Sequence, residues 1–179
     1  MGAFFLLVVH DLAAFTSLYG TNVRLAGEFS GSLANSGERL TLLGPLGEPI
    51  LDFSYDPAWY PITDGGGFSL VVVDPSAPAS TWGLAANWRP SSELGGSPAA
   101  LDPAPPPASL SLLPIAGSNA VVLTWPAAAG SFTLYATGAL APPGQWFRVA
   151  NAPVLSNGRW MVAISPAGQG TCFYRLQAP

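Results

Sequence analysis

Apolar and polar residues alternate over short stretches of this chain, and a period of two predicts β-strands. Apolar side chains at every second position share one face of a strand, first at Leu51, Phe53 and Tyr55 and later at Val121, Leu123 and Trp125. A helix is indicated only where Asp11 can cap residues 12–19, with Gly20 after the last turn. The pattern therefore predicts an all-β chain with one short helix.

The first half of the chain predicts strands separated by turns rich in glycine and proline. We expect strands at residues 4–9, 22–26, 39–43, 50–55 and 68–73. Residues 39–43 and 50–55 should form a hairpin around the loop 44–49, and three consecutive glycines at 65–67 force a turn. We expect the stretch 74–97 to be loop-like, with Trp82 and Trp88 as anchors.

The second half predicts a more regular series of strands. We expect them at residues 110–113, 119–125, 132–136, 146–149 and 171–176, with a hairpin over 155–160. Asn157-Gly158 is the strongest hairpin signal, because it suits a type I′ turn. Cys172, Tyr174 and Leu176 share a face of the last strand, which predicts a buried Cys172. Short strands at this spacing suit a small β-sandwich.

Charge and proline content change together near residue 100, which indicates two domains. All ten acidic residues lie at or before Asp102, where three arginines leave a net charge of −7. Residues 103–179 hold three arginines and no acid, a net charge of +3. The segment 98–107 is rich in proline and alanine, which predicts a semi-rigid linker. We therefore expect one domain over 1–97, a linker over 98–107 and a second domain over 108–179.

The composition excludes several chemistries. The chain has no lysine, so it has neither a P-loop lysine nor a Schiff-base lysine. One histidine and one cysteine are too few for a zinc site of the usual kind, and a single cysteine cannot form an intramolecular disulfide. An isoelectric point near 4.6 and a net charge of −4 argue against a nucleic-acid partner. No cofactor is indicated.

The start of the chain has some features of a signal peptide. The apolar run 3–9 is short, no lysine or arginine precedes it, and no small-residue cleavage motif follows. A buried strand is therefore the preferred interpretation. No apolar stretch approaches the roughly 18 residues of a membrane span.

Several blocks of residues 19–98 follow one another in a specific order. They are Tyr19-Gly-Thr21, residues 23–43, Ile50-Leu-Asp-Phe-Ser-Tyr-Asp56, Trp59-Tyr-Pro61, Asp64-Gly-Gly-Gly-Phe-Ser-Leu70, Asn87-Trp-Arg-Pro-Ser-Ser92 and Gly96-Ser-Pro98. Together they resemble the bacterial lamin tail domain. The resemblance implies an immunoglobulin-like β-sandwich without known catalytic residues. It also implies attachment to large exported or surface proteins, including hydrolases and spore-coat-type kinases.

The second domain resembles a C-terminal module of large exported proteins from planctomycete- and verrucomicrobium-type bacteria. The matching blocks are Leu123-Thr-Trp-Pro126, Phe132-Thr-Leu134, Trp146 and Phe173-Tyr-Arg-Leu176. This resemblance implies a fibronectin type III-like fold. The expected architecture is thus two tandem immunoglobulin-like β-sandwich modules joined by a proline-rich linker.

The first domain departs from the lamin tail pattern in one respect. Strands that precede the segment 3–9 in the family have no counterpart here, and about five strands are predicted where a sandwich has about seven. We therefore expect an N-terminally truncated domain from a longer polypeptide, with Met1 as a misassigned start. Such a domain would expose a strand edge that can pair with another chain.

Three carboxylates, Asp52, Asp56 and Asp64, are the candidate metal ligands. Carboxylates near a strand end and a glycine-rich turn can bind Ca²⁺ through oxygen, although no EF-hand pattern is present. The alternative is that Asp56 and Asp64 form Asx turns before Pro57 and Gly65. A glycosidase acid and nucleophile is a further interpretation, which the small size of the chain disfavours.

Other candidate groups have structural alternatives. His10 and Asp11 match no hydrolase pattern, since the chain lacks a G-x-S-x-G elbow, and we expect His10 to end a strand. Loop aromatics can stack on sugars or on partner side chains, or they can plug the ends of a sandwich. The candidate ligand- or partner-binding residues of this type are Trp59, Tyr60, Trp82 and Trp88.

These observations predict a non-catalytic structural or interaction module, acting as a spacer, in docking or in adhesion. It would form the C-terminal part of a larger exported bacterial protein, at the cell surface or outside the cell. Its partners would be proteins or glycans. One alternative is a carbohydrate-binding module that uses the loop aromatics. Another is an accessory segment of a surface hydrolase or spore-coat-type kinase.

Overall fold

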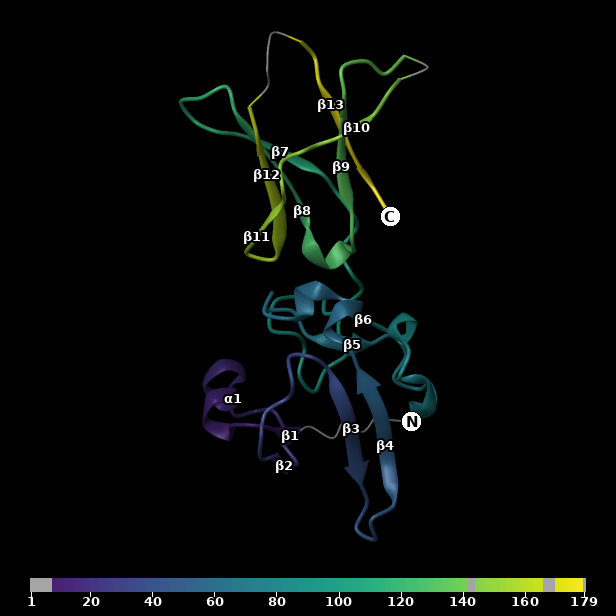
Figure 1. Ribbon diagram of the computed structural model, residues 1–179. Coiled ribbons are helices and arrows are strands. Elements are labelled where there is room, and N and C mark those ends of the chain that lie inside the picture. The colour runs from purple at the N-terminus through teal and green to yellow at the C-terminus, as the bar shows by residue number, and fades with distance from the viewer. Residues whose placement is uncertain (1–7, 142–143, 166–169, 179) are drawn as a thin grey trace. The chain divides into compact units, whose positions relative to one another are not determined.

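The computed structural model describes residues 8–141, 144–165 and 170–178, and it confirms an all-β fold (Figure 1). Most strands pair antiparallel, and the described residues contain one α-helix. The chain divides into two compact units, Met1–Pro103 and Ala104–Pro179. The division after Pro103 falls inside the segment 98–107, which is rich in proline and alanine. Each unit is described by itself below.

Six strands of unit 1 form three separate two-stranded sheets. The sheets are β1–β2, β3–β4 and β5–β6. Their bounds are β1 Val8–Val9, β2 Gly27–Glu28, β3 Glu38–Leu43, β4 Pro49–Tyr55, β5 Leu70–Val72 and β6 Trp88–Pro90. The pair β1–β2 is parallel, and the other two pairs are antiparallel.

The predicted helix α1 covers Leu12–Tyr19, as expected. The Asp11 carboxylate accepts a hydrogen bond from the Ala14 N–H at 2.9 Å, so it satisfies one of the backbone donors that the first turn leaves free. Gly20 ends the helix with a φ of 81°, a conformation that glycine adopts without strain. Both end signals read from the sequence are confirmed.

The β3–β4 hairpin is also confirmed. Its register joins Leu40 to Phe53 and Leu42 to Leu51, with an irregularity after Leu42. Along β4 the side chains alternate between half-buried and exposed, and the half-buried ones are those of Leu51, Phe53 and Tyr55. The period of two therefore predicted the inward face of this strand correctly.

Two expectations for unit 1 are wrong in position. The strand expected at residues 22–26 lies instead at Gly27–Glu28, where it pairs with β1. Trp88 was expected in a loop but begins β6, which pairs with β5. Of the strand expected at residues 4–9, Val8–Val9 forms β1, and residues 4–7 lie outside the described part.

In the part of the chain that the structure describes, four short 3₁₀ helices connect the strands of unit 1, and a fifth lies in unit 2. They are η1 Pro57–Trp59, η2 Pro61–Thr63, η3 Ala79–Thr81, η4 Ala85–Asn87 and η5 Ala127–Ala129. The Asp56 side chain caps η1 by accepting the Ala58 N–H at 2.8 Å. Two of these turns, η3 and η4, lie in the stretch 74–97, which was expected to be loop-like.

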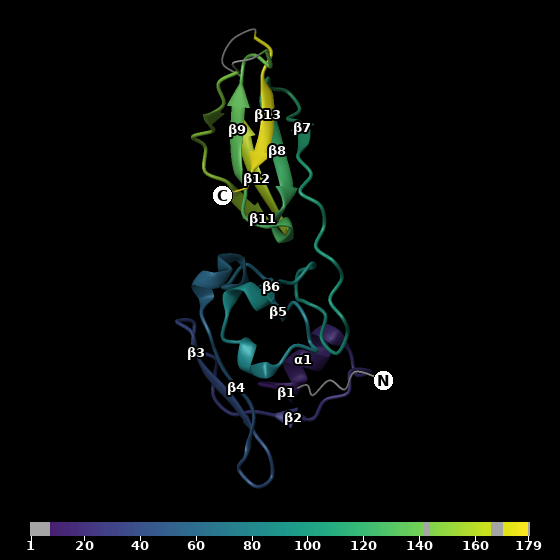
Figure 2. The ribbon, with the colours of Figure 1, turned by 90° about the vertical axis from the view of Figure 1, so that its right-hand side faces the viewer.

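The described residues of unit 2 form seven strands in two antiparallel sheets. Figure 2 shows β8, β9, β12 and β13 side by side with the edge strand β7. One sheet has the order β11–β12–β8–β7 and the other β10–β9–β13. The strands are β7 Ser111–Pro114, β8 Val121–Pro126, β9 Thr133–Thr137, β10 Phe147–Arg148, β11 Val154–Ser156, β12 Arg159–Ile164 and β13 Phe173–Gln177. Both sheets contribute to a single core.

The core of unit 2 centres on Trp125, which is fully buried, and on Leu123, Leu134 and Val162. Leu123 and Trp125 come from β8, and Val162 comes from the neighbouring β12. Leu134 comes from β9 of the other sheet, and Tyr174 and Leu176 of β13 pack against the same cluster. Leu123 and Trp125 of β8, and Tyr174 and Leu176 of β13, thus face the core as the alternation predicted.

The hairpin β11–β12 has the predicted turn. Asn157 and Gly158 have φ values of 49° and 72°, the left-handed pair that a type I′ turn requires. One prediction for the last strand is wrong. Cys172 is exposed and precedes β13, because the strand begins at Phe173.

Candidate functional site

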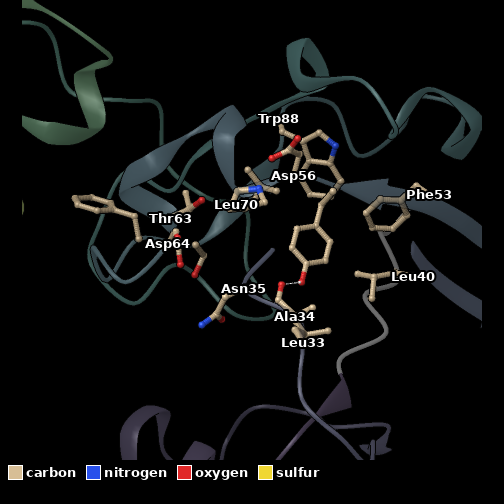
Figure 3. A pocket seen from close by; sticks show the side chains of 14 residues that line it. Leu33, Ala34, Asn35, Leu40, Phe53, Asp56, Thr63, Asp64, Leu70 and Trp88 are labelled. Carbon is tan, nitrogen blue, oxygen red and sulfur yellow. Dashed lines mark hydrogen bonds between the residues drawn. The ribbon is translucent and has the colours of Figure 1, made fainter. Parts of the chain in front are cut away.

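A pocket of about 490 Å³ opens in unit 1 beside the β3–β4 hairpin (Figure 3). Apolar and aromatic side chains form part of its wall, among them Leu40, Phe53 and Trp88. Asp64 and Asn35 lie on the other side of the pocket from Phe53 and Leu40. An aromatic wall with a few polar groups is typical of a binding pocket.

Local sequence explains how these groups meet. Alternation along β4 turns Phe53 and Tyr55 inward, and β6 places Trp88 beside Phe53. Asp56 follows β4 directly and caps η1, whereas Asp64 follows η2 before the three glycines. Gly66 is required by close packing, since a side chain there would meet the Ile62 carbonyl oxygen.

Tyr55 holds one end of the pocket in place. Its hydroxyl donates a hydrogen bond to the Ala34 carbonyl at 2.7 Å, the dashed line in Figure 3. The Glu38 carboxylate accepts the Ala34 N–H at 2.7 Å and lies 3.3 Å from the same hydroxyl. Burial raises the pKa of Tyr55, and the negative charge of Glu38 raises it further. Tyr55 therefore stays neutral and acts as a donor that fixes the loop before β3.

The three candidate calcium ligands are not brought together as one site. Asp52 forms an ion pair with Arg39, whose Nε donates to Oδ1 at 2.6 Å, and this hydrogen bond lowers the pKa of Asp52. Asp56 makes the Asx turn that was the alternative interpretation. Asp56 and Asp64 do line the same pocket. Within the described ranges, no three His, Cys, Asp or Glu side chains are grouped to hold a metal ion.

The candidate loop aromatics pack on one another. Trp88 is nearly buried, and its ring centre lies 5.3 Å from Phe53, 5.8 Å from Trp82 and 6.5 Å from Trp59. The Trp88 indole N–H donates to the Trp82 carbonyl at 2.6 Å. The Tyr60 hydroxyl donates to the Ala85 carbonyl at 3.2 Å. Most of this aromatic surface is therefore packed inside unit 1, and of the four candidate aromatics Trp88 lines the pocket.

A buried polar network that sequence analysis missed lies where unit 1 ends. Asp102 is almost fully buried as a side chain and accepts hydrogen bonds from Arg89, from the Ser92 N–H at 2.9 Å and from the Ser97 hydroxyl at 2.9 Å. Burial raises the pKa of Asp102, but these hydrogen bonds together outweigh it and leave the pKa below its usual value. No short motif marks this network, because its members are spread over residues 89–102 and meet only where this segment folds back on β6.

The remaining candidates lie outside the pocket. His10 follows β1, as expected for a residue that ends a strand, and its ring packs against Phe29 at 5.6 Å. Arg175 of β13 stacks on Trp146, with its guanidinium 4.3 Å from the ring centre. In the part of the chain that the structure describes, no helix is long and apolar enough to span a membrane.

The comparisons with known proteins give no relative. No family model, no curated protein and no solved structure matches the chain. The aromatic wall and two carboxylates of the pocket can bind a ligand through stacking, hydrogen bonds and charge.

Proposed function

We propose that the chain is a non-catalytic interaction module from the C-terminal part of a larger exported bacterial protein. In this proposal unit 1 is a lamin tail-type domain and unit 2 a fibronectin type III-type domain, which serve as a spacer or in docking or adhesion. The lamin tail blocks and the C-terminal motif blocks support the family part of the proposal. The all-β architecture in two compact units is consistent with it.

One observation carries the non-catalytic part. Two of the three candidate carboxylates make structural contacts, since Asp52 pairs with Arg39 and Asp56 caps η1, and the buried Asp102 pairs with Arg89. A catalytic pair needs one carboxylate poised to release a proton and another to accept it. The Arg39 hydrogen bond instead lowers the pKa of Asp52. Burial raises the pKa of Asp102, but the hydrogen bonds from Arg89, Ser92 and Ser97 together outweigh it, so both carboxylates favour the ionised form.

The test is the size and location of the native polypeptide. An antibody raised against unit 2 is used to blot fractionated source cells. A band far above 18.4 kDa in the envelope or the medium supports the proposal. The same result is expected if the chain is an accessory segment of a hydrolase or spore-coat-type kinase. A band near 18 kDa in the cytoplasm would overturn the proposal.

A second candidate function, carbohydrate binding, is favoured by the pocket beside Trp88. Sugar rings stack on aromatic faces, and carboxylates accept hydrogen bonds from sugar hydroxyls. We expect a glycan that enters this pocket to change the tryptophan fluorescence of the chain, and Asp64→Asn to weaken the response. Ser80→Ala, which alters an exposed position outside the pocket, is the matched control. A flat response to a broad glycan panel would exclude this function.

A further inference from the structure

A second concave region of unit 1 lies between α1 and the sheet β5–β6. It is a groove of about 730 Å³, and its lining is mostly apolar. The helix contributes Phe15 and Leu18, β1 contributes Val9, and the segment after β2 contributes Phe29. Leu18 is 73% exposed, so the groove is open to solvent. Neither the candidate metal ligands nor the candidate loop aromatics lie in this groove.

One wall of the groove is a strand edge. Leu70, Val71 and Val72, the whole of β5, line it. Among the described residues β5 pairs with β6 alone. In an antiparallel pair, residues that exchange backbone hydrogen bonds alternate with residues whose N–H and C=O groups point to the opposite side. The side of β5 that faces away from β6 is therefore able to accept another strand.

The register shows which backbone groups of β5 point away from β6. The Ser91 N–H donates to the Ser69 carbonyl, and the Val73 N–H donates to the Asn87 carbonyl. Val71, which lies between them and opposite Arg89, then belongs to the bonded set. The N–H and C=O groups of Leu70 and Val72 point away from β6. Pro90, which has no N–H, lies opposite Leu70, as this pattern requires.

The negative charge of unit 1 determines which kind of polypeptide segment the groove attracts. Residues 1–102 hold ten acids and three arginines. Two of these arginines, Arg39 and Arg89, are already paired with Asp52 and Asp102. Asp11 lies in the wall of the groove. A basic segment is therefore attracted to this surface, and an acidic one is repelled.

We propose that the groove binds an extended polypeptide segment in which apolar residues alternate with arginine or lysine. The segment adds a strand to β5, so that its backbone pairs with Leu70 and Val72 while its apolar side chains enter the groove beside Phe15 and Leu18. Its cationic residues face the acidic surface of unit 1. This inference rests on the proposed role as an interaction module, and it specifies the surface of unit 1 that binds the partner.

The probe is a fluorescently labelled peptide, Arg-Val-Thr-Val-Arg-Val-Thr-Val-Arg, titrated with the full chain at low salt and followed by fluorescence anisotropy. We expect saturable binding that weakens as salt is added. The same peptide with N-methyl groups on alternate residues cannot pair along that edge, and we expect at least a tenfold weaker affinity. A peptide with glutamate in place of arginine should also bind at least tenfold more weakly.

The protein variant is Val72→Pro, with Val72→Ala as the matched control. Proline removes the N–H that points into the groove and leaves the bonded position Val71 unchanged, whereas alanine keeps that N–H. We expect the proline variant to lose at least tenfold in affinity and the alanine variant to lose less than threefold. Circular dichroism checks that both are folded. If Val72→Pro does not fold, the N-methylated peptide on the wild-type chain decides the question.

No saturation up to about 1 mM peptide would overturn the proposal. Equal binding of the parent and N-methylated peptides would overturn strand addition, and equal binding of the arginine and glutamate peptides would overturn the charge preference. The blot of the native polypeptide is independent of these results. A failed titration therefore leaves the proposed function standing, and a small cytoplasmic band leaves the peptide result standing.

Discussion

Among the described residues, unit 2 joins its strands into two continuous sheets that enclose one core, whereas unit 1 joins its strands in pairs. The central strands β8, β9 and β12 each have a neighbour on both sides, and Trp125 lies fully buried between the sheets. In unit 1 the packing of Trp88 on Phe53 joins the sheets β3–β4 and β5–β6, and the network around Asp102 fixes the segment after β6. Strands with similar local sequence patterns are therefore stabilised by different contacts in the two units.

The difference follows from what lies between the strands. In unit 2 the strands, of up to six residues, follow one another at shorter intervals than β4, β5 and β6 of unit 1, so apolar faces accumulate in two layers. In unit 1 long segments with glycine, proline and 3₁₀ turns separate β4, β5 and β6. Isolated two-stranded sheets are marginal in water, so side chains from these segments must complete the packing.

The largest effect is expected at the centre of unit 2. Trp125→Ala should lower the free energy of unfolding by about 3–5 kcal/mol, because it empties a fully enclosed site. Leu113→Ala on the edge strand β7, where the side chain is 54% exposed, should change it by less than about 0.5 kcal/mol. Chemical denaturation with hydrogen-exchange mass spectrometry resolves the two units. Equal effects of the two substitutions would contradict the two-sheet core.

The aromatic packing of unit 1 is tested by Phe53→Ala. We expect a loss of about 2–3 kcal/mol, less than at Trp125, because Phe53 is only half-buried. Ile50→Ala, on the exposed face of the same strand, is the matched control and should have little effect. Hydrogen exchange of β4 and β6 measures the change. Protection lost equally in both variants would show that the cluster does not hold these sheets.

Acid should lower the stability of unit 1 but not that of unit 2. The pKa of Asp102 is lowered in the folded state, so its contribution is present above the ordinary pKa near 3.8 and is lost as the pH falls through the lowered value. Unit 2 has no acidic side chain and should keep its stability over the same range. Hydrogen exchange between pH 5 and pH 2 measures both. Parallel loss in the two units would contradict this prediction.

The same network has a variant that removes its charge. Asp102→Asn should cost unit 1 about 1–3 kcal/mol at neutral pH, because Arg89 loses a charged acceptor. It should also flatten the acid response of unit 1. Asp74→Asn, at an exposed Asx turn with Ser76, is the control and should cost less.

A smaller effect is expected at the turn of the β11–β12 hairpin. Gly158→Ala should lower the stability of unit 2 by about 1–2 kcal/mol, because alanine is strained at a φ of 72°. Asn157→Gly keeps the turn and should be nearly neutral. Thermal unfolding measures both. A neutral Gly158→Ala would mean that the turn relaxes to another type.

The smallest effect is expected at the helix cap of unit 1. Asp11→Ala should cost about 0.5–1 kcal/mol, because the Ala14 N–H loses its acceptor. Asp11→Asn keeps an acceptor and is the matched control. Hydrogen exchange of the first turn of α1 is the readout, and unchanged protection in Asp11→Ala would contradict the role of the cap.

Local signals in the sequence predicted local structure well. The cap at Asp11, the hairpin loop 44–49 and the turn at Asn157 were all predicted, because each depends on neighbours in sequence. Alternation also predicted which side chains of β4 and β8 face inward. The predicted position was wrong for the short strand β2. The predicted burial was wrong for Cys172, because β13 begins one residue after it.

The candidate site was predicted only in part. Trp88, Asp56 and Asp64 were singled out and do line one pocket. Phe53 and Tyr55 were recognised as inward-facing but not as part of a site. The Arg89–Asp102 network and the groove beside β5 could not be predicted, because their members meet only through tertiary packing. Spacing along the chain carries no signal for such contacts.

The Asn157-Gly158 turn also makes unit 2 subject to chemical ageing. Glycine places no side chain in the way when its backbone nitrogen attacks the preceding asparagine amide, and Asn157 is exposed to solvent. The reaction expels ammonia, and the cyclic imide that results opens with water to aspartate or isoaspartate. Either product would give the acid-free unit its first carboxylate side chain, and isoaspartate would lengthen the backbone of a tight turn by one carbon. Old preparations of the protein should therefore become heterogeneous first at the tip of this hairpin.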